Sequence, residues 1–279
     1  MAYRIDVNAG RPTRSGEREA TIVLVGCGGT GSFLAESVCR LLIGRTADLY
    51  LVDMDRVEEH NIGRQAFGAE DLGRFKAQVL AERLARRFAR TVGYSVQPYD
   101  RARHSEVFGR QSGQLKLLIG AVDNSAARRA MAATLDGRSD VLWLDCGNGR
   151  NSGQVLLGNA TRPEMLRGAF LPQQGICRAL PAPSLQRPDL LDAPPAPQPA
   201  LDCAAAMAIS EQGGTVNQAV AAIAASFVEK LLDGSCGWMA SYFDLDDGTL
   251  GCVPAEPRAV AGIAGLHLNA VTKQTSAGG

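Results

Sequence analysis

The chain has 279 residues, of which 46% are hydrophobic, so it can fill the core of one large α/β domain or two small ones. Lysine plus arginine and aspartate plus glutamate number 29 each, which gives no general electrostatic footprint for nucleic acid or an anionic membrane. The seven scattered cysteines lack C-x-x-C spacing and fit neither a secreted disulfide framework nor a zinc ribbon, so a reducing cytoplasm is expected. Residues 1–19 lack a signal-peptide apolar stretch, and the longest apolar run, 219–227, is too short to span a bilayer.

The first half of the chain alternates short apolar runs with helical patterns. Residues 1–20 are polar and basic and are expected to form an N-terminal extension. Thr21–Val25 is an apolar run that ends in glycines, as a buried parallel strand does. Residues 34–42 have helical spacing, and the apolar run at 49–52 completes a strand–helix–strand unit. The two strands should therefore be parallel.

The same alternation continues downstream. Residues 76–89 place apolar side chains on one helical face, and two further apolar runs lie at 115–122 and 141–145. This order predicts an α/β fold with a doubly wound, mostly parallel Rossmann-like sheet. After Gly147 we expect a strand at 154–157.

The C-terminal part should contain helices and a hairpin. A proline-rich stretch at 171–200 predicts a loop or mobile flap. Helical patterns follow at 204–211 and 216–232, and Tyr242–Val253 predicts a β-hairpin that turns at Asp247-Gly248. The tail, 257–279, is expected to be disordered.

A glycine motif joins the first strand to the first helix. It has the form G-x-G-x-x-G, with glycines at Gly26, Gly28, Gly29 and Gly31. Missing side chains let such a backbone approach phosphates, and the helix N-terminus offers amide donors to an anion. Alone, the motif fits a tight structural turn equally well. Asp53, about 20 residues further on at a strand end, is placed to bind a ribose hydroxyl and favours a nucleotide site.

Charged and polar residues downstream favour ATP over NAD. The reacting end of NAD is an uncharged nicotinamide, whereas attack on a phosphoryl group spreads negative charge that Arg, Lys and Mg²⁺ stabilise. Suitable residues follow strand ends or begin a helix: Asp55, Asn61, Arg64, Gln65, Lys76 and Asp123. Taken one at a time, Arg64 could be a solvated surface charge and Asp123 a helix cap. Coincidence is a poor explanation for all of these residues occurring together in this order.

The order of these motifs resembles the ThiF/MoeB superfamily, relatives of the ubiquitin-activating enzymes. The resemblance lies within about 21–158, in Gly26–Gly31, Asp53-Met-Asp55, Asn61-Ile-Gly-Arg-Gln65, Gly73-Arg-Phe-Lys76 and Asp123-Asn124 with Arg128. It implies an adenylation domain over 21–256. With ATP and Mg²⁺, such a domain adenylates the C-terminal glycine carboxylate of a small ubiquitin-like or sulfur-carrier protein and releases pyrophosphate.

The resemblance also implies roles for the matching residues. These are ribose binding by Asp53, phosphate binding by Asn61, Arg64 and Lys76, support of that cluster by Gln65, and Mg²⁺ binding by Asp123. Arg64, Lys76 and Asp123 are the expected catalytic residues, and Asp55 and the four glycines complete the nucleotide site. Arg128 is expected to be structural.

The C-terminal half departs from the superfamily pattern. The two C-x-x-C pairs that hold zinc in many members are missing, so a structural zinc is not expected. Residues 171–200 lie where the family has a crossover loop over the active site, which in some members carries a cysteine that attacks the acyl-adenylate. Cys177, beside Arg178, and Cys203, near a predicted helix start, are the candidates. For each, an unreactive structural cysteine is an equal alternative.

The proline-rich loop, Leu201-Asp-Cys-Ala204 and Thr215–Val220 resemble the ThiF-related proteins of the PRTRC plasmid cassette more than MoeB. This implies a bacterial, often plasmid-borne setting with a small partner protein encoded nearby. The family also implies a homodimer, in which Arg11 or Arg14 of one protomer completes the phosphate site of the other. An ordinary tail arginine is the alternative.

Three functions stay open. The leading hypothesis is the adenylating enzyme. The second is a nucleotide-binding regulatory module of this fold without acyl-adenylate chemistry. The third, an NAD-dependent oxidoreductase, rests on the glycine loop and Asp53 alone, because His60, His104 and His267 lie in no recognisable catalytic motif.

Overall fold

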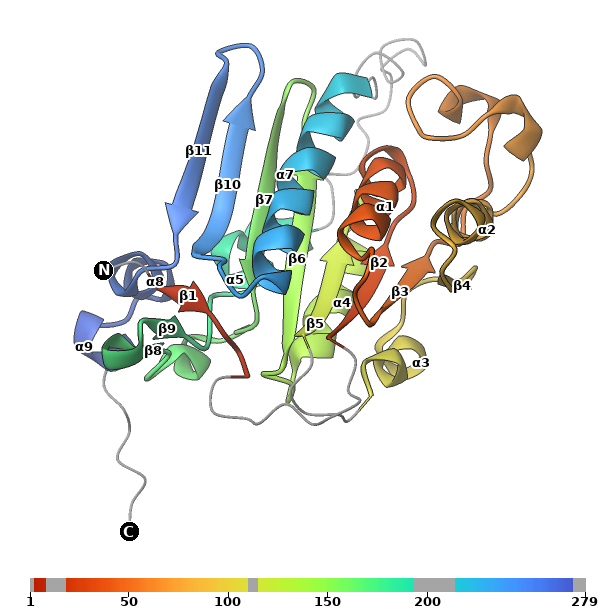
Figure 1. Ribbon diagram of the computed structural model, residues 1–279. Coiled ribbons are helices and arrows are strands. Elements are labelled where there is room, and N and C mark those ends of the chain that lie inside the picture. The colour runs from red at the N-terminus through yellow and green to blue at the C-terminus, as the bar shows by residue number, and fades with distance from the viewer. Residues whose placement is uncertain (1–2, 9–18, 110–114, 193–213, 273–279) are drawn as a thin grey trace.

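An eight-stranded sheet runs through the centre of the computed structural model, which describes residues 3–8, 19–109, 115–192 and 214–272 (Figure 1). Its strand order is β11-β10-β7-β6-β5-β2-β3-β4. The strands are β2 (Ala20–Val25), β3 (Ala47–Val52), β4 (Gly93–Ser95), β5 (Leu115–Gly120), β6 (Val141–Asn148), β7 (Ser152–Gly158), β10 (Trp238–Asp244) and β11 (Thr249–Pro254).

The five strands from β6 to β4 are mutually parallel, so the predicted doubly wound, mostly parallel sheet is confirmed. Every residue of β2 is buried, because Ile22 and Leu24 pack in the larger hydrophobic core while Val23 and Val25 pack in a second one. A strand covered on both faces needs a continuous apolar run rather than alternation, which is the pattern that its sequence has.

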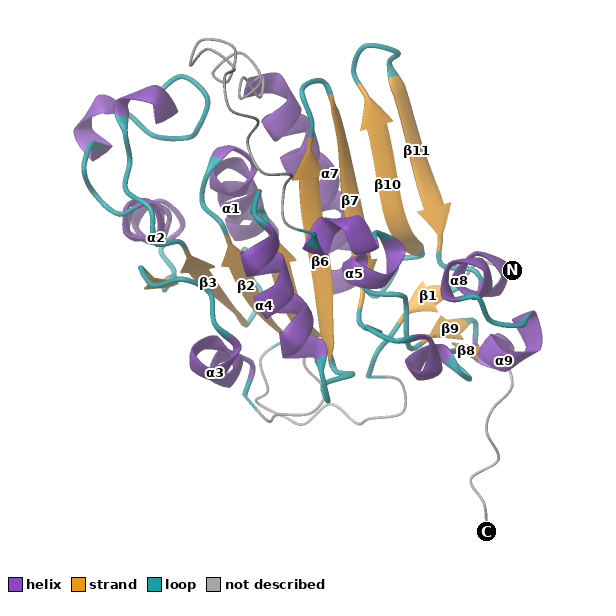
Figure 2. Ribbon diagram, turned by 180° about the vertical axis from the view of Figure 1, so that it is seen from behind, coloured by secondary structure: helices purple, strands orange, loops and turns teal. Residues whose placement is uncertain are grey.

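Helices cover both faces of this sheet. They are α1 (Gly29–Leu41), α2 (Lys76–Phe88), α3 (Arg101–His104), α4 (Ser125–Leu135), α5 (Pro183–Gln186), α7 (Gly214–Leu232), α8 (Pro257–Ala264) and α9 (Leu268–Thr272). Figure 1 shows α1 and α7 on the near face, and Figure 2 shows α4 and α5 on the other. Among the described helices, none combines the length and hydropathy needed to cross a bilayer.

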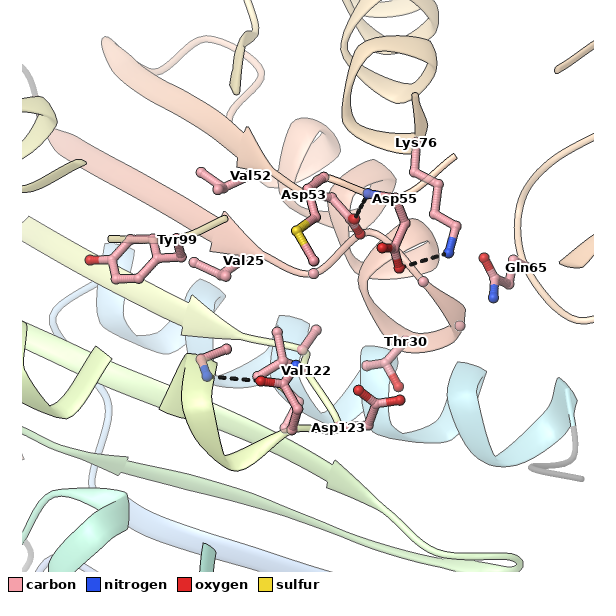
Figure 3. Close-up of a pocket in the computed structure, with 18 of the residues that line it drawn as sticks. Val25, Thr30, Val52, Asp53, Asp55, Gln65, Lys76, Tyr99, Val122 and Asp123 are labelled. Carbon is pink, nitrogen blue, oxygen red and sulfur yellow. Dashed lines mark hydrogen bonds and ion pairs between the residues drawn. The ribbon is translucent and has the colours of Figure 1, made fainter. Parts of the chain in front are cut away.

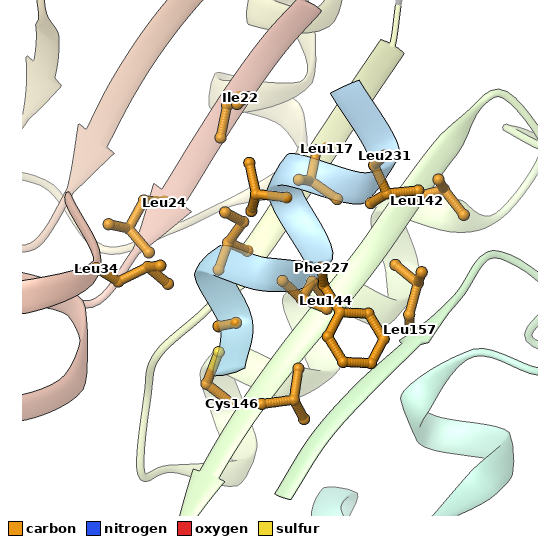
Figure 4. Packing of buried hydrophobic residues seen from close by; sticks show 14 of the residues in the cluster. Ile22, Leu24, Leu34, Leu117, Leu142, Leu144, Cys146, Leu157, Phe227 and Leu231 are labelled. Carbon is orange, nitrogen blue, oxygen red and sulfur yellow. The ribbon is translucent and has the colours of Figure 1, made fainter. Parts of the chain in front are cut away.

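Helix α7, predicted at 216–232, joins the C-terminal half of the chain to the parallel sheet. It packs against α1 and against β6 and β7. Its fully buried Phe227 lies among Leu144, Leu157 and Leu231 in the core beneath the helix (Figure 4). Burial of these side chains therefore holds the start of α7 in a defined position relative to α1.

The predicted hairpin is present and extends the sheet. Strand β10 pairs antiparallel with both β7 and β11, and the turn between its two strands contains Asp247-Gly248. Gly248 has a φ of +65°, a conformation that favours glycine.

Part of the N-terminal extension forms a second, small sheet. Its three strands are β1 (Arg4–Ile5), β9 (Ile176–Cys177) and β8 (Phe170–Leu171). Tyr3 contacts Phe170 edge to face, with ring centroids 4.8 Å apart. Tyr3–Ile5 are thus tied to the segment at 170–177, where the proline-rich stretch begins.

The expected loop at 171–200 is only partly a loop. Up to residue 192 it contains β9, α5 and two 3₁₀ turns, and Leu180 and Ala182 are fully buried. The side-chain amide of Gln186 donates to the carbonyls of Leu157 at 3.1 Å and Pro181 at 2.8 Å, which fixes this stretch to the sheet. The rest of the stretch, and the predicted helix at 204–211, lie outside the described residues.

The expectation of disorder from residue 257 is wrong as far as residue 272. Helix α8 begins with Pro257 and ends at Ala264, and Gly265 at its C-terminal cap has a φ of +63°. Proline in the first turn and glycine at the C-terminal cap are helix start and stop signals. Val260 in α8 and Val271 in α9 are fully buried, so tertiary packing holds both short helices. Residues 273–279 lie outside the described part.

The burial of Phe227 allows a test of how α7 is held. We expect Phe227→Ala to lower the free energy of unfolding by about 3–5 kcal/mol, because it leaves a cavity in the core. Chemical denaturation followed by circular dichroism measures this change. Glu229→Ala, at an exposed position of the same helix, should stay within about 0.5 kcal/mol of the parent. Equal losses in the two variants would contradict the assigned packing.

Candidate functional site

A cavity of about 530 Å³ lies at the carboxyl ends of the parallel strands, where open α/β sheets bind ligands. The predicted site residues that line it are Gly26, Gly28, Gly29, Asp53, Asp55, Asn61, Arg64, Gln65, Lys76 and Asp123. Of the predicted set within the described residues, Gly31 and Cys177 lie elsewhere. The structure therefore brings together residues from β3, β5, the glycine loop and the start of α2.

The glycines of the loop serve two different purposes. Gly26 has a φ of +90°, and a Cβ there would lie 2.3 Å from the carbonyl oxygen of Ala121. A Cβ on Gly31 would lie 1.9 Å from the carbonyl oxygen of Gly26. These two positions are needed for the loop to fold. A Cβ on Gly28 would meet only the Gln65 amide nitrogen, at 3.9 Å, so that position opens onto the cavity.

Asp53 is held at the end of β3 by two backbone amides. Its Oδ2 accepts a hydrogen bond from the Cys27 N–H at 2.6 Å, and its Oδ1 accepts one from the Asp55 N–H at 2.8 Å. Burial raises the pKa of Asp53, while the two amides act in the opposite direction. The carboxylate is thereby fixed between the glycine loop and the strand end, on the cavity wall (Figure 3).

Two cations face the cavity next to this carboxylate. Lys76, only 7% exposed, lies 3.4 Å from the Asp55 carboxylate. The guanidinium of Arg64 has no acidic partner within the described part of the chain. An unpaired guanidinium and a largely buried ammonium on one wall attract an anion into the cavity.

Amide side chains complete this wall. Asn61 is buried, and its Oδ1 accepts from the Glu58 N–H at 3.0 Å, which leaves the amide nitrogen for a ligand. The buried Oε1 of Gln65 has no hydrogen-bond partner within the described residues. The wall thus offers both donors and an acceptor beside the two cations.

The opposite end of the cavity is apolar. Val25, Val52 and Tyr99 gather there, and Pro98 also lines it (Figure 3). The Tyr99 hydroxyl is bonded to Thr134 at 3.0 Å, and burial raises the pKa of Tyr99 to about 12. A cavity with an apolar end and a cationic wall suits a molecule that carries a flat ring and an anionic group. The sequence did not predict this end, because its loop residues carry no motif.

Asp123 stands where two cavities meet. A second cavity, of about 540 Å³, shares Val122, Asp123 and Asn148 with the first. No group of three or more His, Cys, Asp or Glu side chains that could hold a metal occurs within the described ranges. Mg²⁺ is commonly bound by one or two carboxylates plus substrate phosphates, so the single carboxylate of Asp123 fits that ion.

Comparison of the chain with models of known protein families identifies its family. The model of the ThiF family matches residues 8–243. The chain belongs to the ThiF family.

Among curated relatives, "ubiquitin-like modifier-activating enzyme 5" of Branchiostoma floridae is 31% identical over 147 residues, which cover 48% of this chain and 35% of that protein. The match thus spans about a third of the relative. Among solved structures, PaaA has a TM-score of 0.59 at 17% identity and covers 85% of this chain and 73% of its own. Escherichia coli MccB, solved with ATP, has a TM-score of 0.54 at 15% identity and covers 85% and 64%. MccB has also been solved with AMPCPP and MccA. These structural likenesses show the fold.

Of the two alternatives given for Cys177 in this ThiF-family chain, its surroundings fit the unreactive structural cysteine. Cys177 is fully buried in β9, lines neither cavity, and its thiol contacts the Ala179 carbonyl at 3.3 Å. Burial raises the pKa of Cys177 to about 12, so the exposed thiolate that a nucleophile requires is missing. Cys203, Arg11 and Arg14 lie outside the described residues.

Arg128 has the structural surroundings that were expected for it. Its Nε lies 3.1 and 3.3 Å from the two oxygens of the fully buried Asp145. Burial raises the pKa of Asp145, and Arg128 opposes that shift. The pair therefore fixes α4 to β6 beneath the loop that carries Asp123.

A residue that sequence reasoning missed reaches the glycine loop from α7. Asn217 is 1% exposed, lines the first cavity, and accepts a hydrogen bond from the Thr30 hydroxyl at 3.2 Å. It lies on the same buried helix face as Ala221 and Ala224. A polar residue on a buried helix face was the signal that could have identified it.

The glycine geometry allows a direct comparison of two variants. We expect Gly31→Ala to destabilise or prevent folding, because its Cβ meets the loop backbone. Gly28→Ala should keep the free energy of unfolding within about 1 kcal/mol yet weaken nucleotide binding, because its methyl group points into the cavity. Thermal unfolding and equilibrium binding measure the two effects. A stable Gly31→Ala variant would contradict the role assigned to that glycine.

The Arg128–Asp145 pair predicts a pH dependence of stability. Arg128→Met should cost about 3–5 kcal/mol, because it leaves an unpaired buried carboxylate. The folded variant then keeps a proton on Asp145 that the unfolded chain releases above about pH 4, so its stability should fall as pH rises. Denaturation between pH 4 and 8 checks the sign. The double variant with Asp145→Asn should lose this added slope, and an unchanged slope in the single variant would refute the assignment.

Proposed function

We propose that this ThiF-family protein is an ATP- and Mg²⁺-dependent adenylyltransferase that activates the C-terminal glycine carboxylate of a small ubiquitin-like or sulfur-carrier protein. One observation carries the proposal. A single cavity with an apolar end is lined by the glycine loop, by the Asp53 carboxylate at the position expected to bind a ribose, by two cations and by Asp123. The charge and shape of that cavity suit a nucleoside polyphosphate better than a nicotinamide dinucleotide, whose reacting ring needs no cations.

The chemistry would place negative charge where the cations lie. An oxygen of the glycine carboxylate attacks the α-phosphorus of ATP, the bond to the bridging oxygen breaks, and pyrophosphate leaves with the bonding electron pair. Arg64 and Lys76 would stabilise the charge on the phosphate oxygens, with Asn61 as a further donor. Asp123 would hold Mg²⁺, which when bound neutralises charge on the phosphates.

The second cavity supports a reaction between two substrates. Because it shares Val122, Asp123 and Asn148 with the first, a chain end in it would meet the nucleotide beside Asp123. Its other polar lining includes Gln154, Arg187 and Tyr242. Two similar proteins support a protein or peptide substrate, since one is a ubiquitin-like modifier-activating enzyme and MccB was solved with MccA.

The sequence resemblance extends this proposal to the biological setting. We place the protein with the ThiF-related members of the bacterial PRTRC plasmid cassette, acting in the reducing cytoplasm on a small partner encoded nearby. It would act as a homodimer in which Arg11 or Arg14 of one protomer reaches the phosphate site of the other. Gel filtration with light scattering, and exchange assays on Arg11→Ala and Arg14→Ala, would test this arrangement.

The decisive experiment is ATP–pyrophosphate exchange with candidate partners that end in glycine. We expect Mg²⁺-dependent exchange that requires the partner, and a rate at least about 100-fold lower for Arg64→Ala with ATP binding retained. Asp123→Asn should lower the rate similarly. Arg167→Ala, an exposed arginine that lines neither cavity, is the matched control and should behave as the parent.

Other outcomes would identify the competing functions. ATP binding without exchange for any partner would indicate a nucleotide-binding regulatory module of this fold. Binding of NAD in preference to ATP would indicate an oxidoreductase. Exchange that survives Asp123→Asn unchanged would show that the mechanism is wrongly assigned.

A further inference from the structure

The side-chain amide of Asn217 uses its oxygen, but not its nitrogen, in hydrogen bonds with described residues. Its Oδ1 accepts hydrogen bonds from the Thr30 hydroxyl and from the Asn148 side-chain amide. These two contacts fix the orientation of the amide, so that Nδ2 lies on the side of the glycine loop. The structure gives Nδ2 no acceptor within the described part of the chain, although Asn217 is only 1% exposed.

The Asn217 amide takes up the space that a side chain at Gly29 would need. A Cβ built on Gly29 would lie 2.3 Å from Nδ2 and 2.6 Å from the side-chain carbon of Asn217. Gly29 is not one of the glycines with positive φ. Its missing side chain is therefore explained by the space that the Asn217 amide takes up, and the two positions form one unit.

Nδ2 lies beside Gly29, in the first turn of α1. The first bond within this helix runs from the Ser32 N–H to the Gly28 carbonyl at 3.0 Å, so the amides before Ser32 precede the helical ladder. A helix N-terminus attracts anions. Asn217 lines the same cavity as Gly28 and Gly29, which puts a side-chain donor beside that anion position.

We propose that Asn217 is a phosphate-binding residue, contributed by α7, that donates from Nδ2 to a phosphate oxygen of the bound nucleotide. This inference rests on the proposed nucleotide site and adds a ligand from a part of the chain far in sequence from the glycine loop. Nδ2 has no acceptor in the described part of the chain, and an anionic oxygen in the cavity that Asn217 lines would supply one. The competing role is purely structural, with Asn217 tying α7 to the glycine loop.

The experiment measures binding of adenosine, AMP and ATP by calorimetry to the full chain and its variants. Asn217→Asp keeps an acceptor for Thr30 and Asn148 but turns an oxygen toward the phosphates. We expect it to lower affinity for ATP about ten- to a hundred-fold, for AMP less, and for adenosine within about two-fold. Asn217→Ala should show the same order with smaller losses. Thermal unfolding reports whether each variant folds.

A matched control is Asn159→Asp. Asn159 is also 1% exposed, but its amide nitrogen donates to the backbone carbonyls of Ser139 at 2.8 Å and Arg178 at 3.3 Å, away from both cavities. This variant can lose stability, but any loss of affinity should be the same for all three ligands. Equal losses for adenosine and ATP in the Asn217 variants, or no loss, would overturn the proposal in favour of the structural role.

A second pair of variants tests the link to Gly29. Gly29→Ala should displace the Asn217 amide and reduce ATP affinity by a similar factor to Asn217→Ala, and the double variant should add little to either. Additive losses would show that the two residues act separately and would contradict the proposal. The wild-type measurement separates the two levels of inference. If the wild-type protein does not bind ATP, the proposed function itself is contradicted. If it binds ATP and no Asn217 variant changes the affinity, only the role of Asn217 is contradicted.

Discussion

The close approach of the glycine loop to the strand beside it is the constraint on which the site depends. A side chain at Gly26 would collide with the Ala121 backbone at the end of β5, and one at Gly31 would collide with Gly26 itself. Only a chain without side chains at these positions lets β2 turn into α1 within so short a distance. The turn brings Gly28 and the first turn of α1 to the same edge as Asp53, whose carboxylate accepts from the Cys27 amide in the loop. Loop and strand end are therefore positioned by one set of contacts.

A second constraint comes from α7, which extends the site beyond the strand–helix–strand unit. The apolar face of α7 is buried against α1, β6 and β7, with Phe227 among the fully buried side chains. That burial is far from the cavity, yet it determines where the first turn of α7 lies. Asn217 in this turn contacts Thr30 of α1 and Asn148 of β6. Core packing and cavity geometry are thus coupled, because a shift of α7 would move the amide that fills the space at Gly29.

The sequence predicted what local rules control. The parallel strands, the glycine loop and the hairpin turn at Asp247-Gly248 follow from apolar runs, missing side chains and turn residues. Most predicted cavity residues follow a strand end, and the carboxyl ends of neighbouring parallel strands meet at one edge. Asn217 and Tyr99 could not be found in this way, since only tertiary packing brings α7 and the loop after β4 to that edge. The error at 257–272 has a related cause, because α8 and α9 are too short to be stable alone and are held by the burial of Val260 and Val271. The sequence could not decide between the two alternatives for Cys177, because position in a loop says nothing about burial.

The distribution of charge explains how a chain without net charge can hold a strongly anionic ligand. Lysines and arginines balance acidic residues overall, so attraction must come from local arrangement. Many arginines on the surface pair with carboxylates, as Arg74 does with Glu82 and Arg187 with Asp189. Arg64 lacks such a partner among the described residues, and Lys76 is close to Asp55 but nearly buried. A cation on a cavity wall whose charge is not already neutralised interacts with a phosphate more strongly than a paired surface cation does. The chain has no net charge, but the positive charges of Arg64 and Lys76 therefore lie together on one wall of the cavity, opposite the apolar end where Tyr99 lies.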